Sequence, residues 1–417
     1  MRKTGLRRIA ASALLATVVA MAPQASRPAV AAEIGPEADW CSAANALAPG
    51  AELVLRPGDY AGPCSIRTSG RPGAPIVIRA ADPAARPRLV FLGSRDNVVN
   101  LAASFVTLRG LAFGPTLPDI DAIRIKQGGE EVTIEDCTFS GLGGLAIVSH
   151  STSRRLTIRN NEIIGSNATA IYVGCHDGYS CQVTDALIEG NYIDGVEALP
   201  PQIGYGVQVK LNSTAVIRDN VIVNTKGPGI MVYGSHDTTR PSLVERNFLA
   251  RSRTSSGIVV GGGPVTVRNN ISVAAAEAGI GLENYGRRGL LRGVVVAHNT
   301  VHGGRKGGIS APADGPAEVK LFHNAVHSHG GMALPAPRAG IVALGNVDCR
   351  LLPCFIDPGN LDFTPLPDSP LGAQAKPGWH LTRDDYFGTP RPAVAAIGAV
   401  ERATGSAVRI GRKLRPN

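Results

Sequence analysis

Apolar residues return in short alternating groups along most of this chain, and one asparagine follows a group in every cycle. The segment 157–163 shows the pattern, with Ile158 before an asparagine pair and Ile163 after it. The equivalent asparagines are Asn161, Asn191, Asn220, Asn247, Asn270, Asn299 and Asn324. Consecutive members are 23 to 30 residues apart. A unit this short, built of strands and turns, cannot bury an apolar face alone, so neighbouring units must stack.

A second signature lies upstream of each asparagine: a small residue, an apolar residue, any residue and usually another apolar residue. It begins at Ala122, Ala146, Ala170, Gly206, Gly229, Gly257 and Gly279. Alternation with a period of two marks a strand with one buried face. We expect each unit to contain this strand, a variable loop, the strand ending in asparagine and a short third strand. Stacking such units predicts a parallel β-helix, in which the asparagine side chains bond to the backbone and to each other.

Together, the two signatures resemble the secreted right-handed parallel β-helix proteins, and especially their polysaccharide lyase and uronan C5-epimerase branches. The resemblance covers about residues 75–346, and the segment 56–60, Arg-Pro-Gly-Asp-Tyr, is similar to the opening segment of that group. It implies an all-β fold: a right-handed parallel β-helix (solenoid) of about ten coils with capped ends. The Asn-Gly-Glu calcium segment of the alginate and dermatan lyase branch is absent. These motifs are more specific for the fold than for an activity, since different sites are built on one fold.

The first residues of the chain predict export. Residues 1–31 combine a basic start with an apolar run, 9–21, that is too short to span a membrane. Ala29, Val30 and Ala31 then fit a small-residue cleavage site. We therefore expect a signal peptide over 1–31, a secreted or periplasmic protein, and no stable insertion in a membrane.

The repeat also sets the expected domains. We expect an N-terminal cap over 32–74, the β-helix over 75–346, a C-terminal cap over 347–400 and a disordered tail over 401–417. Caps are required because an open terminal coil would present unpaired backbone groups. We expect the protein to be a monomer.

Charge and cysteine content narrow the partners and the compartment. The formal net charge is +9, and five of the basic residues lie in 1–31, which leaves +4 for the remainder. This mild excess does not indicate a nucleic-acid surface, and it suits an acidic polysaccharide.

Seven cysteines in an exported chain indicate disulfides. Cys137 takes the place of a repeat asparagine and is expected to be a buried thiol. The expected local pairs are Cys41–Cys64, Cys175–Cys181 and Cys349–Cys354.

Stacking turns the small-apolar strand into a map of one face, because equivalent residues in neighbouring coils lie roughly 4.8 Å apart. Two rows should point outward. The first row is Arg124, Val148, Tyr172, Gln208, Met231, Val259 and Gly281. The second row is Lys126, His150, Gly174, Lys210, Tyr233, Gly261 and Glu283. We expect a functional cleft on this face, walled by the loops 175–181 and 194–205.

The side chains on this face fit proton abstraction next to a carboxylate. In a uronic-acid sugar, a cation at the carboxylate stabilises the developing enolate, a base takes the C5 proton and an acid protonates the leaving oxygen. The lyases that the chain resembles use such a scheme. We expect Lys210 to be the base, Tyr233 the acid or a stacking residue, and His236 an alternative base. The expected substrate-binding residues are Arg124, Lys126, His150, Tyr172, His176, Gln208 and Glu283.

Three other functions remain open at this point. C5 epimerisation begins with the same proton abstraction. A glycoside hydrolase would need two facing carboxylates, for which Asp237 and Glu283 are the candidates on this face. A non-catalytic glycan-binding protein would use the long side surface of the repeats.

No cofactor is expected and no metal site is assigned. Calcium is an option at Asp119, Asp121, Glu130 and Glu131, which offer hard oxygen ligands. Zinc is an option at a group of histidines without an acidic or cysteine partner. In this group His298 and His302 align with His323 and His327, and His329 lies close by in sequence.

Overall fold

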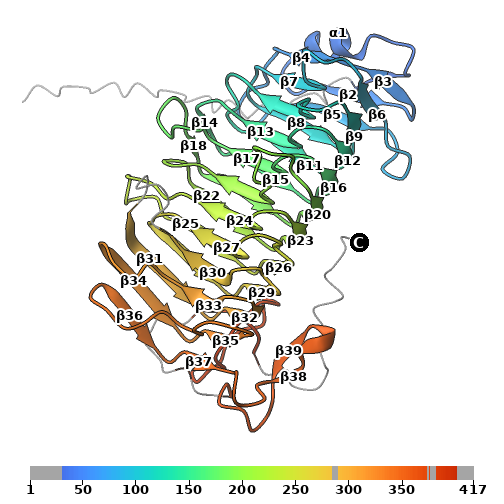
Figure 1. Cartoon of the computed structure of the whole chain (residues 1–417). Helices are drawn as coiled ribbons and strands as arrows, with labels where there is room; N and C mark the ends of the chain where they lie inside the picture. The colour runs from blue at the N-terminus through green and yellow to red at the C-terminus, as the bar shows by residue number, and fades with distance from the viewer. Residues whose placement is uncertain (1–30, 284–289, 373–374, 376–381, 402–417) are drawn as a thin grey trace, which may run out of the picture.

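The computed structural model describes residues 31–283, 290–372, 375 and 382–401. The predicted signal peptide, apart from Ala31, and the predicted tail, apart from Glu401, lie outside these residues. The described chain winds into a right-handed parallel β-helix, as the repeat predicts, and its coils stack from one end of the molecule to the other (Figure 1). Three long parallel sheets run along the solenoid.

The strands of each sheet come from successive coils. The 13-stranded sheet contains β1 (Ala31–Ile34), β2 (Glu52–Leu55), β5 (Ile76–Ala80), β8 (Val106–Arg109), β11 (Thr133–Glu135), β15 (Thr157–Arg159), β19 (Ala186–Glu189), β22 (Ala215–Arg218), β25 (Ser242–Glu245), β28 (Val265–Arg268), β31 (Leu291–Ala297), β34 (Ala317–Phe322) and β36 (Ile341–Leu344). The 10-stranded sheet contains β4 (Cys64–Ile66), β7 (Val99–Leu101), β10 (Ile123–Ile125), β13 (Ile147–Ser149), β17 (Ile171–Val173), β21 (Val207–Val209), β24 (Ile230–Val232), β27 (Ile258–Val260), β30 (Ala278–Leu282) and β33 (Gly307–Ser310). The 12-stranded sheet contains β3 (Asp59–Ala61), β6 (Arg88–Phe91), β9 (Ala112–Thr116), β12 (Thr138–Leu142), β16 (Glu162–Ser166), β20 (Tyr192–Val196), β23 (Val221–Thr225), β26 (Phe248–Ala250), β29 (Ile271–Val273), β32 (Thr300–Gly304), β35 (Ala325–Ser328) and β37 (Val347–Asp348).

The remaining elements are short. They are α1 (Trp40–Asn45), the strand pair β14 (Ser153–Arg154) and β18 (Val183–Thr184), the antiparallel pair β38 (Phe355–Asp357) and β39 (Asp362–Pro365), and the 3₁₀ helix η2 (Pro358–Asn360). No helix among the described residues is long and apolar enough to cross a membrane.

The core is a column of apolar side chains that alternate along each strand. In the small-apolar strands, both predicted inward positions are fully buried, as with Ile123 and Ile125 of β10 or Val207 and Val209 of β21. Burial of one apolar side chain stabilises the fold by about 1.5–3 kcal/mol. Because each coil contributes such side chains from all three sheets, no coil is stable without its neighbours.

The asparagines form the predicted ladder at the corner between the 13-stranded and 12-stranded sheets. The side chain of Asn191 donates to Oδ1 of Asn220 at 2.9 Å and to the carbonyl of Ile158 at 3.0 Å. Its own Oδ1 accepts from Asn161. The ladder continues through Asn346, and at its start the backbone N–H of Cys137 donates to Asn161. The repeat asparagines are therefore scaffold residues, as predicted.

All three predicted disulfides are present, and Cys137 is a buried free thiol. Burial raises the pKa of the Cys137 thiol to about 12, so this sulfur stays protonated at neutral pH. Nucleophilic chemistry needs a thiolate. Cys137 is thus a packing residue.

The N-terminal end of the solenoid has paired strands before residue 75. β2, β3 and β4 lie before residue 75, yet each already pairs with one of the three sheets, so the first coil begins inside the range expected to be a cap. The helix α1 packs at this end (Figure 1), and its Trp40 is 2% exposed. Regular winding begins early because Leu53, Leu55 and Tyr60 supply the same inward apolar positions as later coils.

At the other end, Glu401 is buried. Its carboxylate accepts from Arg391 at 2.9 Å, and the Arg391 side chain is 1% exposed. Arg391 also donates to the side chain of Asn269 and to the carbonyl of Gly398, which joins the closing segment to the coils.

Candidate functional site

The two outward rows predicted from the repeat exist on the 10-stranded sheet. Strand pairing places Arg124 beside Val148, Val148 beside Tyr172, and Tyr172 beside Gln208. The pairing continues in the same register through Met231, Val259 and Gly281. The second row follows the strand ends, where the backbone N–H of each member bonds to the coil before it, as in Lys210 to Val173 and Tyr233 to Val209.

A pocket of about 610 Å³ opens on these rows and joins most of the predicted site. It spans β10 to β24 and the loops beside them. Seven of the ten predicted site residues line it: Arg124, His150, Tyr172, His176, Gln208, Lys210 and Tyr233. The remaining lining residues are Leu145, Thr169, Pro201, Gln202, Ile203 and Tyr205.

Lys210 lies at the bottom of this pocket between two aromatic rings. Its Nζ atom is 4.3 Å from the ring centroid of Tyr233 and 5.5 Å from that of Tyr172. The residue is only 2% exposed. An extended solvated lysine, the ordinary state of a lysine outside a sheet, is thus excluded. The amino group thus lies between two rings that also line the pocket.

Tyr233 is oriented by a second polar contact. The side-chain amide of Gln208 donates to the Tyr233 hydroxyl at 3.4 Å, and both residues are almost fully buried. Met231 and Val259 pack with Tyr233, Tyr205 and Leu211 in a small apolar cluster outside the main core. No row member beyond Tyr233 lines the pocket, so the pocket does not continue along the whole sheet.

Arg124 forms the opposite end of the pocket. Its Nε donates to the buried carboxylate of Asp121 at 2.8 Å, which fixes the guanidinium, and its Nη1 lies 3.3 Å from Nδ1 of His150. A guanidinium only donates hydrogen bonds, so Nδ1 of His150 is the acceptor and Nε2 carries the imidazole proton. His150 also packs edge-on against the ring of Tyr172, with centroids 4.9 Å apart.

The charge state of His150 follows from the same surroundings. Burial, followed by the positive charges of Arg124, Lys210 and His176, lowers the pKa of His150 to about 4. The imidazole is therefore neutral at pH 7. It can offer an N–H to an anionic ligand, but it adds no positive charge of its own.

Both predicted loops reach the pocket. The Cys175–Cys181 disulfide closes a loop that carries His176 to the rim, and the second insertion supplies Pro201, Gln202 and Ile203. Leu145, Thr169 and Tyr205 were missed by the sequence interpretation. Each directly precedes the small residue of the repeat signature, so a third row at that position is the signal that would have found them.

Three predicted site residues do not line the pocket. Lys126 lies 3.7 Å from Asp96 in a solvent-exposed ion pair. Glu283 follows β30, three strands beyond β21 in the sheet, and burial raises the pKa of its carboxyl group. His236 lines a separate small depression, where its Nε2 is 3.5 Å from the Tyr179 hydroxyl.

The turn after β24 explains why His236 is displaced. Gly234 has a φ of +83°, and a Cβ at this position would lie 2.5 Å from the Gly262 carbonyl carbon. The chain therefore turns sharply away from the sheet after Tyr233. The backbone N–H of His236 then bonds to the side chain of Asn212 at 2.9 Å, which holds the loop outside the pocket.

The two carboxylates considered for hydrolysis lie outside the pocket, and three of the four considered for calcium bind arginine. Neither Asp237 nor Glu283 lines the pocket, so the two do not face each other across it. Of the calcium candidates, Glu130 and Glu131 both bind Arg155, at 2.9 and 2.6 Å. Oδ1 of Asp121 accepts the backbone N–H of Leu145 while its Oδ2 binds Arg124.

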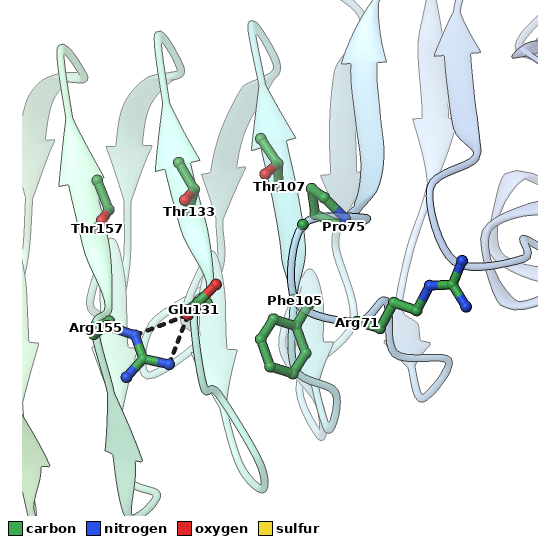
Figure 2. Close-up of a pocket in the computed structure, with 9 residues that line it drawn as sticks. Arg71, Pro75, Phe105, Thr107, Glu131, Thr133, Arg155 and Thr157 are labelled. Carbon is green, nitrogen blue, oxygen red and sulfur yellow. Dashed lines mark hydrogen bonds and ion pairs between the residues drawn. The ribbon is translucent and has the colours of Figure 1, made fainter. Parts of the chain in front are cut away.

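A second depression of about 250 Å³ lies on the 13-stranded sheet. Thr107, Thr133 and Thr157 form a row on three adjacent strands there, as Figure 2 shows. At its edge, the side chain of Arg155 forms an ion pair with Glu131 (Figure 2). The described residues that line this depression include no lysine, histidine or tyrosine, whereas the first pocket has all three.

Comparison with known proteins agrees with the architecture. The sequence matches the family model described as "Right handed beta helix region" over residues 121–287 and 179–356. The search of the curated proteins finds no match. A similar solved structure is an alginate lyase from Paenibacillus sp. str. FPU-7, with a TM-score of 0.51 and 15% identity over 70% of this chain and 96% of that chain.

Two further solved structures extend the likeness over most of the chain. XylC in complex with xylose has a TM-score of 0.57 and 10% identity over 86% of this chain and 94% of that chain. A PL6 family alginate lyase, AlyGC, has a TM-score of 0.51 and 13% identity over 93% of this chain and 58% of that chain. At such identities the likeness concerns the fold. The family-model matches together span residues 121–356, more than half of the 417 residues, and the chain belongs to the right-handed β-helix family.

Proposed function

We propose that this protein is a polysaccharide lyase that cleaves a uronic-acid-containing glycan by β-elimination. The observation that carries the proposal is the composition of the pocket. Arg124, Lys210, two histidines and three tyrosines line it, and none of its described lining residues is an aspartate or a glutamate. Such a pocket favours an anionic ligand, and it lacks the pair of carboxylates that most glycoside hydrolases use.

The carboxylate of the sugar would bind between Arg124 and His150. Arg124 supplies the positive charge, held in place by Asp121. His150 supplies the Nε2 proton as a neutral hydrogen-bond donor. When the C5 proton leaves, negative charge moves onto the carboxylate oxygens, and donors already aimed at that place stabilise it without reorganisation.

Lys210 and Tyr233 would carry the two proton transfers. The Lys210 amine takes the C5 proton, and the C4–O4 bond breaks as the C4–C5 double bond forms. The Tyr233 hydroxyl, oriented by Gln208, protonates the departing oxygen. Lys210 Nζ lies 4.3 Å from the centroid of the Tyr233 ring, so one bound sugar would reach both groups. Two of the solved structures with this fold are alginate lyases, which agrees with the proposal.

The test is a screen of the purified protein against acidic polysaccharides: alginate, pectate, glucuronans and bacterial exopolysaccharides. A lyase produces an unsaturated uronate at each cut, which is followed by ultraviolet absorbance, together with new reducing ends. We expect Lys210→Ala to lose at least about 100-fold in rate, the usual scale for one proton-transfer group. Lys320→Ala, on the exposed face of β34, serves as the matched control and should keep full activity.

Each other result points to a different function. New reducing ends without unsaturation would indicate hydrolysis, and a change in uronate stereochemistry without cleavage would indicate C5 epimerisation. Binding without any product would indicate a glycan-binding protein. Full activity in a folded Lys210→Ala protein, checked by circular dichroism, would remove Lys210 from the mechanism.

A further inference from the structure

Three histidines converge near the C-terminal end of the solenoid, far along the coils from the pocket. His302 lies on β32, His327 is its register partner on β35, and His329 directly follows β35. One ring nitrogen from each histidine lies within 4.8 Å of the other two. Among the described residues, no other group of three metal-ligating side chains comes together in this way.

The packing leaves polar atoms of this triad without partners. The rings of His302 and His327 stack with centroids 4.6 Å apart, and His329 meets both rings edge-on, at 6.1 and 5.3 Å. The Nδ1 atoms of His302 and His327 are buried and have no hydrogen-bond partner. An unpaired buried polar atom costs about 1–3 kcal/mol. Two of them in one cluster therefore require an explanation.

The surroundings of the triad are apolar on one side and open on the other. The rings of Phe355 and Phe363, from β38 and β39, pack against His302 at 6.4 and 5.5 Å. His329 is exposed, so an ion can enter from solvent on that side.

We propose that His302, His327 and His329 form a binding site for a zinc ion. Three imidazoles occupy three corners of a tetrahedron, and a water molecule takes the fourth on the exposed side. With Zn–N bonds of about 2.0–2.1 Å, two nitrogens on one ion lie about 3.3 Å apart. In the structure the three nitrogens lie within 4.8 Å of one another. Small ring rotations, most easily that of the exposed His329, would bring them to the spacing that zinc requires.

The choice of zinc follows from the ligand set. Three nitrogen ligands and no carboxylate disfavour calcium and magnesium, which require oxygen. The carboxylate near the triad, Asp348 on β37, already binds Arg350 at 2.9 Å through both oxygens. Because the three ligands come from β32, β35 and the residue after β35, bound zinc would fasten two successive coils to each other. The site lies on the 12-stranded sheet and is independent of the lyase proposal.

The experiment uses the full mature protein without a polyhistidine tag, treated with chelator and then titrated with zinc chloride in a calorimeter. We expect one zinc per chain, and a rise in melting temperature with zinc. His302→Gln and His329→Gln should each weaken binding by at least about 100-fold, since loss of a second-shell partner alone costs 10–100-fold. His329 is exposed, so its replacement leaves the core intact. His236→Gln, a histidine elsewhere on the surface, is the matched control and should bind zinc as the unaltered protein does.

Cobalt provides a second readout, because tetrahedral cobalt substituted for zinc absorbs strongly in the visible range. We expect that absorbance in the unaltered protein and in His236→Gln, and its loss in His329→Gln. The proposal is overturned if the untagged protein takes up no zinc at micromolar concentration. It is also overturned if both triad variants bind zinc normally, or if the site accepts copper or nickel and refuses zinc.

Discussion

At the residue scale, each repeat asparagine uses its whole amide group. Asn220 donates to Oδ1 of Asn247 and to the carbonyl of Ile188, both at 2.9 Å. Its own Oδ1 accepts the backbone N–H and the side chain of Asn191, also at 2.9 Å. The residue is completely buried, so no water can replace these bonds. The side chain thus satisfies backbone groups at a corner where the strands cannot.

Removing one member of the ladder should therefore be costly. We expect Asn220→Ala to lower the free energy of unfolding by about 3 kcal/mol, because several buried polar groups lose a partner. Asn360→Ala removes a solvent-exposed bond to Asp357 and should cost less than about 0.5 kcal/mol. Denaturant unfolding followed by circular dichroism compares the two. Equal losses in the free energy of unfolding would show that a place in the ladder adds no stability.

Single residues also show which features the sequence predicts and which it does not. The repeat predicts that Asn161, Cys137 and the inward isoleucines are buried, because each position recurs with a fixed spacing and must face the same neighbours. It predicts that Gln208 and Lys210 point away from the core, and they do. It does not predict that both are buried. Their burial depends on the path of a loop, and loop paths carry no periodic signal.

At the element scale, two insertions convert a regular sheet into a pocket. The loop between β17 and β18 is closed by the Cys175–Cys181 disulfide and carries His176, and the loop between β20 and β21 adds Pro201 and Tyr205 to the pocket lining. The sequence predicts both insertions from the interrupted repeat, and their side of the sheet from the strands they join. The displacement of His236 depends on the turn at Gly234, which a short loop motif does not reveal.

The disulfide loop gives a prediction at this scale. We expect the double variant Cys175→Ser, Cys181→Ser to keep its fold but to lose about tenfold in kcat/KM on the substrate found in the screen. A short bridge of this kind contributes roughly 2 kcal/mol by restraining the chain, and here the restraint positions His176 at the rim. The matched control is Cys349→Ser with Cys354→Ser, which removes the other short bridge far from the pocket. A loss of activity in the control alone would contradict this role for the loop.

At the scale of the whole molecule, the solenoid is closed by different means at its two ends. The N-terminal end uses α1 and the Cys41–Cys64 bridge, and the C-terminal end uses a segment held by the buried pair of Arg391 and Glu401. The repeat predicts that both ends need covers. It does not predict that regular coils begin before residue 75, because the asparagine repeat begins only at Asn161.

The C-terminal closure should make the protein sensitive to acid. His298 is completely buried, and burial, followed by the charge of Arg391, lowers its pKa well below the ordinary value. In the unfolded chain His298 takes a proton below about pH 6.5, whereas in the folded protein it does not. The unfolded state then binds more protons, so stability is complete above that pH and falls as the pH drops below it.

The measurement is the melting temperature between pH 7.5 and pH 5. We expect it to fall on acidification, and to fall less steeply in His298→Leu, which removes one of the groups that must stay neutral. The matched control is His236→Gln, whose exposed ring should leave the slope unchanged. Identical slopes in all three proteins would exclude His298 as a source of the acid sensitivity.

The asparagine ladder has one further consequence, which concerns how such a protein can change length. Every rung of the ladder makes the same contacts with the rung before and the rung after it, whatever the length of chain between them. A complete turn, from one asparagine to the next, can thus be inserted or removed. The two turns that become neighbours then make the same asparagine contacts as before. The 23 residues that separate Asn247 from Asn270 form one such turn. The length of the molecule can therefore vary in whole turns.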